Sequence, residues 1–137
     1  MIYQTQTTSF KTELLSGVHD LSTDTIKLAL YTDSADLSET TTVYSATNET
    51  SGTGYSAGGV TLTGVTIGSS NGVAYVSFDN AVWNPATFSA AGGLLYNASK
   101  SNKSIAVLSF GAIKTATNTF TVQMPPNTSS SALLRIV

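Results

Sequence analysis

Short segments of alternating apolar and polar residues recur along this chain, and they limit the possible folds more than any other feature. The clearest is Thr25 to Tyr31 (TIKLALY), where one face is apolar and the other holds Lys27 and Ala29. A period of two is typical of a strand. Further strand-like segments, which alternate or form short apolar runs bounded by turn residues, are Val60 to Ile67, Val73 to Phe78, Gly93 to Asn97, Ser104 to Phe110, Thr119 to Met124 and Leu133 to Val137. About seven or eight strands with few helical signals between them predict an all-β sandwich of jelly-roll type.

Two local signals specify how consecutive strands connect. The apolar residues of Val60 to Ile67 change parity at Gly64, and a glycine at such a point suggests a β-bulge or a bend between two sheets. The dipeptide Asn71-Gly72 favours a tight hairpin turn. We therefore expect a hairpin that joins Val60 to Ile67 with Val73 to Phe78.

Charged residues are scarce, at 10% of the 137 residues against about 25% in an average soluble domain. The polar surface must come from serine and threonine, which number 41, and threonine favours strands. The net charge of -2 and six scattered lysines and arginines argue against nucleic-acid binding. The absence of cysteine excludes disulfides and thiolate metal sites. The length fits a single domain.

One short helix is predicted, over Phe10 to Leu15, with Ser9 as its N-cap and Gly17 at its end. The preceding residues, Met1 to Ser9, alternate like a strand, and we expect them to form an arm outside a single domain of residues 10–137. The first residues lack the basic and apolar regions of a signal peptide. The longest apolar stretch, Ile105 to Ile113, is too short to span a membrane as a helix.

The core is predicted from the strand faces that should meet between the two sheets. The expected core residues are Ile26, Leu28, Leu30, Val73, Tyr75, Leu95, Val107, Phe110, Phe120 and Val122.

No motif for catalysis or metal binding is complete. His19 is followed by Asp20, but no G-x-S-x-G nucleophile motif accompanies them, so a surface or capping histidine is the favoured interpretation. Asp33-x-x-Asp36 with Glu39 nearby offers oxygen ligands for calcium but lacks the spacing of an EF-hand. We expect no enzymatic activity, no catalytic residue, no cofactor and no metal site.

Two regions suggest contact with a partner. The segment Asp33 to Gly59 is long and rich in small polar residues, and loops of this length are often functional or ordered by a partner. A lone tryptophan is usually a core residue, and otherwise an interface anchor or a platform for sugar stacking. The interface candidates are Ile2 and Tyr3 of the arm, Tyr44 and Tyr55 of the long segment, and Trp83.

The order of motifs resembles that of small virion structural proteins of tailed bacteriophages, a group assigned to the head, as decoration proteins, or to the tail. The resemblance rests on SFKTELLSGVHDLSTDTIKLALYT, SGTGYSAGG, GLLYNASKSNKSIAVLSFG, TFTVQMPPN and the terminal LLRIV, which cover most of the chain. Similar sequences often carry Arg-Gly-Ala before the Leu-Ile-Tyr-Asn run, where this chain has Ala91, Gly92 and Gly93. An intersubunit contact made by that arginine would be missing here.

The resemblance implies a non-enzymatic part of the virion, made in the host cytoplasm. We expect a capsid decoration (cement) protein on the outer surface of the head, a homotrimer that bridges subunits of the major capsid protein or other virion proteins. Few charges and many hydroxyls suit extensive hydrogen-bonded contacts with neighbours. The alternative is a tail or fibre module that binds host-surface glycans through Asp33 to Gly59 and the region of Trp83. No nucleic acid and no membrane is expected as a partner.

Overall fold

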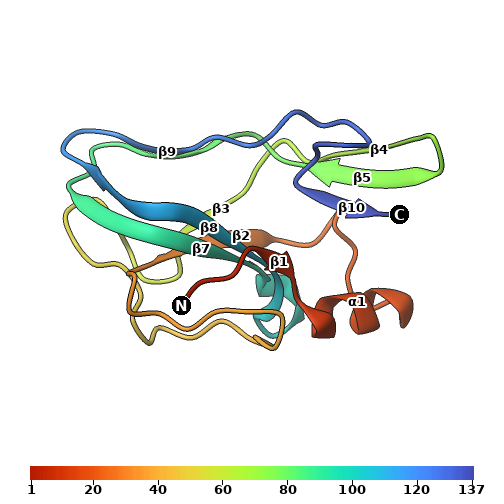
Figure 1. Ribbon diagram of the computed structural model, residues 1–137, viewed down its shortest axis with the longest axis horizontal. Coiled ribbons are helices and arrows are strands. Elements are labelled where there is room, and N and C mark those ends of the chain that lie inside the picture. The colour runs from red at the N-terminus through yellow and green to blue at the C-terminus, as the bar shows by residue number, and fades with distance from the viewer.

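The computed structural model describes residues 1–137 and shows an all-β, sandwich-like fold. Its central sheet has five antiparallel strands in the order β1-β8-β7-β2-β3. Long strands lie in the middle of this sheet and short ones at its edges, as Figure 1 shows. Their bounds are β1 (Thr5–Gln6), β8 (Lys103–Ala116), β7 (Phe88–Asn97), β2 (Ile26–Tyr31) and β3 (Val60–Thr61).

A second layer of shorter strands covers one face of the central sheet (Figure 1). It consists of a three-stranded sheet, β10-β5-β4, and a two-stranded sheet, β6-β9. The bounds are β4 (Thr66–Ser70), β5 (Val73–Ser77), β6 (Ala81–Trp83), β9 (Phe120–Val122) and β10 (Leu134–Ile136). The split of this layer into two sheets does not by itself establish a jelly roll, which stays a prediction.

The predicted hairpin is confirmed. Strands β4 and β5 pair from Thr66 opposite Ser77 to Ser70 opposite Val73. Asn71 and Gly72 form the turn with φ angles of 53° and 78°, the left-handed conformation that this dipeptide adopts readily. Gly64, with φ 67°, lies between β3 of the central sheet and β4 of the second layer, so the predicted bend between two sheets is also confirmed.

The helix α1 spans Thr8–Leu15, and its N-cap is Thr7 rather than Ser9. The Thr7 hydroxyl accepts a hydrogen bond of 3.3 Å from the Phe10 N–H. Ser9 lies inside the first turn, so the predicted cap was two residues too late. A short 3-10 helix, η1 (Ala98–Lys100), follows β7. Neither helical segment has the length and apolar character needed to cross a membrane.

Residues 1–9 lie against their own domain, which corrects the expectation of an arm outside it. Thr5 and Gln6 pair with Val107 and Ala106 of β8, and the Tyr3 N–H donates to the Leu37 carbonyl at 2.9 Å. The edge of β8 therefore satisfies backbone groups of this segment within the same chain. This pairing joins residues 1–9 to the domain of residues 10–137.

Most of the predicted core is buried, and two of the three residues that are only half-buried lie on β5. The buried predictions are Ile26, Leu28, Leu30, Leu95, Val107, Phe120 and Val122. Val73 and Tyr75 are half-buried, while Val76 and Phe78, of opposite parity, lie in the core. Both parities of Val73 to Phe78 are apolar, so alternation alone could not assign the face. Phe110 is half-buried against the core.

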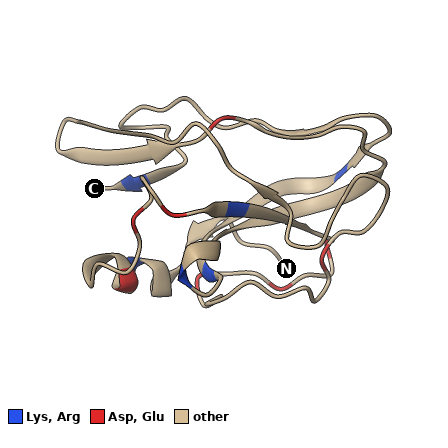
Figure 2. Ribbon diagram, turned by 180° about the vertical axis from the view of Figure 1, so that it is seen from behind, with Lys and Arg blue, Asp and Glu red and all other residues tan.

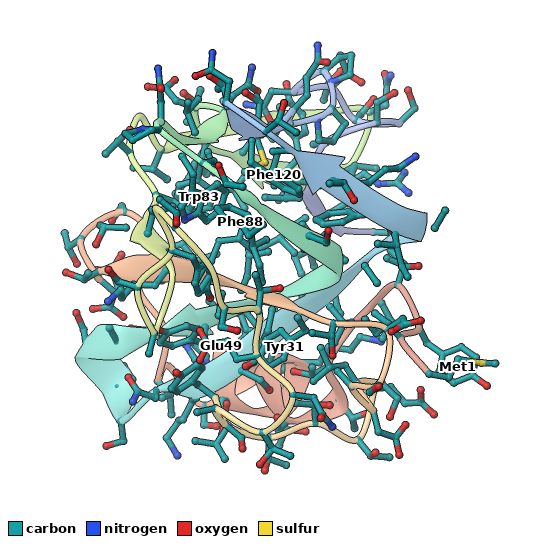
Figure 3. All side chains as sticks on the ribbon, turned by 90° about the vertical axis from the view of Figure 1, so that its left-hand side faces the viewer. Met1, Tyr31, Glu49, Trp83, Phe88 and Phe120 are labelled. Atoms are coloured by element: carbon teal, nitrogen blue, oxygen red, sulfur yellow. The ribbon has the colours of Figure 1, made fainter.

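Two hydrophobic clusters lie on opposite faces of the central sheet. The larger packs between the two layers and includes Trp83, Phe88 and Phe120, whose rings lie 5.1 to 6.2 Å apart. The smaller lies under the segment 32–59 and includes Tyr31 and Tyr96. Figure 3 shows the three aromatic residues on one side of the sheet and Tyr31 with Glu49 on the other.

Candidate protein interface

The long segment from Asp33 to Gly59 is tied to the domain by one carboxylate. Glu49 accepts a hydrogen bond from the Tyr44 hydroxyl at 2.6 Å, another from the Tyr55 hydroxyl, and a third from the Gly58 N–H at 2.8 Å. These residues, together with Tyr31 and Tyr96, are called the Glu49 cluster below. Its bonds order a loop that has few strand contacts of its own.

Two further hydroxyls of the Glu49 cluster hold the backbone of this loop. Tyr96 donates to the Gly58 carbonyl and Tyr31 to the Ser45 carbonyl, both at 2.6 Å. Tyr44 and Tyr96 stack with their ring centroids 4.8 Å apart. Each bonded hydroxyl therefore fixes a point of the loop against the central sheet.

The electrostatics of the cluster favour neutral tyrosines. Burial and the nearby Glu49 carboxylate raise the pKa of Tyr96 to about 12. The pKa values of Tyr31, Tyr44 and Tyr55 are raised further, first by burial and then by Glu49, which accepts hydrogen bonds from the last two. The cluster thus depends on hydroxyls that remain protonated.

The Glu49 cluster also closes one edge of the central sheet. The Leu30 N–H donates to the Tyr55 hydroxyl oxygen at 2.9 Å, and the Leu30 carbonyl accepts from the Thr50 N–H at 2.9 Å. The Thr32 N–H donates to the Asn48 carbonyl at 3.0 Å. The outer edge from Leu30 of β2 to Thr32, the residue that follows β2, is called the closed edge, because its backbone groups are already paired.

The opposite edge of the sheet is open. On the side of β1, no strand pairs with β8 beyond Val107, and β9 pairs only with β6. Along Ser109 to Ala116, which we call the open edge, Gln4 reaches one backbone group, the N–H of Ser109 at 3.2 Å. Unpaired backbone groups at a sheet edge are a template for another strand.

A groove of about 1020 Å³ runs between the open edge and β9. Twenty-three residues line it, ten of them hydrophobic, and its only charged residues are Lys114 and Arg135. The other linings are Gln4–Gln6, Ala106–Phe110, Thr115–Ala116, Thr119–Pro126 and Ser131–Leu133. Charge is sparse over the whole molecule (Figure 2), so the groove is a large concave surface with little charge to desolvate.

The five interface candidates are not brought together. Trp83 is 4% exposed and belongs to the core, so it is available neither as an anchor nor as a sugar platform. Tyr44 and Tyr55 serve the Glu49 cluster, and Ile2 packs half-buried against the smaller hydrophobic cluster. Tyr3 alone is largely accessible, at 54% exposed. The groove was missed, because its lining comes from segments far apart in sequence.

His19 is a buried residue rather than a surface residue, and both of its ring nitrogens are engaged by other side chains. Its Nε2 lies 2.9 Å from Glu13 Oε1 and its Nδ1 lies 3.0 Å from Asn97 Nδ2. The Asn97 amide is oriented by Ser99, whose N–H donates to Oδ1, and by the Asp24 carboxylate on Nδ2. Asn97 therefore donates to Nδ1, and Nε2–H donates to Glu13. With both nitrogens engaged and the side chain fully buried, His19 cannot activate a serine.

Asp24 completes this buried network. Burial alone would raise the pKa of its carboxyl, but hydrogen bonds from Asn97, from the Asp20 N–H and from Lys100 outweigh burial and lower the pKa to about 2. The Lys100 ammonium lies 2.9 Å from the Asp24 carboxylate. The network joins the segment after α1 to β7 and η1, which is a structural role.

No group of three or more His, Cys, Asp or Glu side chains is placed to hold a metal ion, and this includes Asp33, Asp36 and Glu39. Comparison of the chain with protein-family models, with curated proteins and with solved structures finds no match.

Proposed function

We propose that this chain is a non-enzymatic structural protein of a tailed-bacteriophage virion, which decorates the head and bridges capsid subunits as a homotrimer. The sequence motifs that resemble small virion proteins support the proposal. So does the engagement of His19, the only histidine, in a buried structural network.

The observation that carries the proposal is the groove beside the open edge. It is large, mostly neutral and bounded by backbone groups that no strand of this chain pairs. An extended segment of a neighbouring virion protein, seated in it, would add a strand to β8 and cover the exposed apolar side chains. Lys114 and Arg135 favour a segment that carries acidic rather than basic residues.

The mechanism is mechanical. Each bridge buries interface area that has to be broken before two capsid subunits separate, so the shell withstands a higher internal pressure. A trimer offers three such grooves around one axis, which matches a local three-fold position on a head.

The first test is the number of copies in purified particles, measured by quantitative mass spectrometry. A head decoration protein is expected in a copy number comparable with that of the major capsid protein. A copy number like that of tail proteins would instead support the tail or fibre alternative and overturn the head assignment.

A second test addresses the groove itself. Thr121 is exposed, lines the groove and lies on β9, so Thr121→Arg places a long charged side chain at the groove without replacing a core residue. We expect this variant to be lost from particles. Thr47→Arg, at an exposed position of the segment that closes the other edge, is the matched control and should be retained. Full retention of Thr121→Arg would contradict a bridge through the groove.

A further inference from the structure

The second layer is interrupted where strand pairing passes from β5 and β10 to β6 and β9. The chain crosses this seam twice, at Phe78 to Asn80 and again after β9, and the Met124 N–H donates to Asn80 Oδ1 at 2.7 Å. A pocket of about 340 Å³ opens at the seam. Its lining includes Gly64, Ser77, Asp79 and Asn127.

Two buried oxygen atoms in this seam pocket have no hydrogen-bond partner. They are the hydroxyl oxygen of Ser77, a residue 5% exposed, and the amide oxygen of Asn127. The Asn127 amide is held by its other end, because Nδ2 donates to the Thr66 carbonyl at 3.2 Å. A buried polar atom without a partner costs about 1–3 kcal/mol, and no group of this chain satisfies these two oxygens, so both are free to coordinate a ligand.

A carboxylate stands at the mouth of the same pocket. Asp79 is exposed and forms no ion pair within the chain. Its carboxylate lies directly over Gly64, where a Cβ would come within 2.2 to 2.4 Å of the carboxylate atoms. Only glycine leaves space for the carboxylate in this position.

The chemistry of these groups selects the ligand. Asp79 and Asn127 can only accept at the oxygens concerned, and the Ser77 hydroxyl oxygen can accept as well. No lysine, arginine or histidine lines the pocket, and its one charged side chain is the Asp79 carboxylate, so its charge favours a cation over an anion. Oxygen ligands without nitrogen or sulfur are those of a hard cation.

We propose that the seam pocket binds a divalent cation, with Ca²⁺ as the best fit. Asp79 supplies the charge, Ser77 Oγ and Asn127 Oδ1 supply neutral oxygens, and waters fill the remaining positions. Calcium tolerates such an irregular, partly hydrated set better than magnesium, which requires near-octahedral geometry. With one carboxylate, the dissociation constant should be on the order of 10⁻⁴ to 10⁻³ M, as in weak extracellular calcium modules.

A bound cation would tie the segment of Asn127 to β5 and to Asp79 across the seam. It would thereby stabilise the part of the second layer that has no continuous strand pairing. This site is independent of the proposed virion function, because its test uses the isolated protein.

The experiment measures the melting temperature of the purified chain in EDTA and with calcium chloride up to about 10 mM, tenfold above the weak end of the expected range. Sodium chloride at matched ionic strength is the control. Calcium should raise the melting temperature of the native chain. No rise beyond that in sodium chloride would overturn the proposal.

Variants identify the ligands. Asp79→Asn should weaken calcium binding by about tenfold, because it removes the only charged ligand. Asp33→Asn, which removes the same charge from an exposed position outside the pocket, should leave binding unchanged. An equal calcium shift in the native chain and in Asp79→Asn would place the cation elsewhere and overturn the site.

Two further variants keep the test independent of any loss of folding. Ser77→Ala removes a buried hydroxyl without a partner, so it should not destabilise the chain in EDTA but should reduce the calcium-dependent rise. Asn80→Asp keeps an oxygen that can accept from the Met124 N–H and adds a second carboxylate to the pocket, so calcium should bind more tightly. Unchanged calcium binding in both variants would overturn the assignment.

Discussion

The two long edges of the central sheet differ in how their backbone groups are satisfied. At the closed edge, Leu30 and Thr32 of the β2 side are paired with Asn48, Thr50 and Tyr55 of the long loop. At the open edge, β8 has no partner strand on its outer side from Ser109 to Ala116, although β7 pairs with its inner side, and this outer side borders the groove. The chain thus protects one edge from association and leaves the other available.

The closed edge shows how a charge-poor chain orders a long loop. Three donors converge on Glu49, and two more tyrosine hydroxyls reach loop carbonyls. Tyr55 links this polar cluster to the core, since its ring lies 5.6 Å from that of Phe88 while its hydroxyl reaches Glu49. A few hydrogen bonds to one carboxylate therefore hold this loop against the sheet, as strand pairing holds the strands together elsewhere.

The largest expected effect is loss of the folded state at high pH. Tyr31, Tyr44, Tyr55 and Tyr96 have raised pKa values, so their stabilisation is complete below the unfolded value near pH 10 and is lost as the pH rises toward 12. Above pH 10, four such hydroxyls together lower the free energy of unfolding by about 5 kcal/mol per pH unit. This loss is comparable with the whole stability of a domain. Circular dichroism should show unfolding between pH 10 and 12. A fold that survives above pH 12 would contradict the role given to these hydroxyls.

The next effect compares apolar packing in the two hydrophobic clusters, on opposite faces of the central sheet. Leu28→Ala, at a fully buried position of β2, should reduce the free energy of unfolding by about 2–5 kcal/mol. Leu37→Ala, at an 8% exposed position within the long loop, should fall at the low end of that range. Urea denaturation of both variants measures the difference, and a smaller loss for Leu28→Ala would reverse the assignment of the main core.

Removal of the carboxylate tests the closed edge directly. Glu49→Ala leaves three donors without their acceptor and should cost about 2–3 kcal/mol, with faster hydrogen exchange at Leu30 and Thr50. Glu39→Ala, an exposed glutamate of the same loop, is the control and should stay within about 0.5 kcal/mol. Equal losses in the two variants would show that the loop is held by something other than Glu49.

The smallest effect on stability is expected at the open edge. Thr121→Arg should change the free energy of unfolding by less than about 0.5 kcal/mol, because the side chain is exposed and makes no hydrogen bond that the fold needs. The same change is expected to remove the protein from particles, so stability and retention should separate. A loss of several kcal/mol would mean that the groove is part of the fold.

Local patterns predicted the elements that depend on neighbouring residues. The alternation of Ile26 to Tyr31 identified β2, and Asn71-Gly72 identified the hairpin, since backbone conformation there is decided by the residues themselves. The face of β5 was assigned wrongly because both of its parities are apolar.

The candidate sites depend on contacts that the sequence does not encode locally. Tyr44 and Tyr55 were singled out as interface residues, yet Glu49, the residue that explains them, was not. Residues 1–9 pair with β8 at an edge of their own central sheet. Their alternation could predict a strand, but it could not predict which strand they pair with. The seam pocket is lined by both Ser77 and Asn127, which are far apart in the sequence and come together only in the fold. No motif with a fixed residue spacing could therefore have predicted the pocket.

The most direct test of the account is the accessibility of the two edges in assembled particles. The chain has no cysteine, so Thr121→Cys beside the open edge and Thr47→Cys on the loop of the closed edge each introduce a unique thiol. Maleimide labelling should be equally fast for both variants in the free protein. On particles, the account predicts strong protection of Thr121→Cys and none of Thr47→Cys. Equal labelling of both on particles, or protection of Thr47→Cys alone, would contradict it.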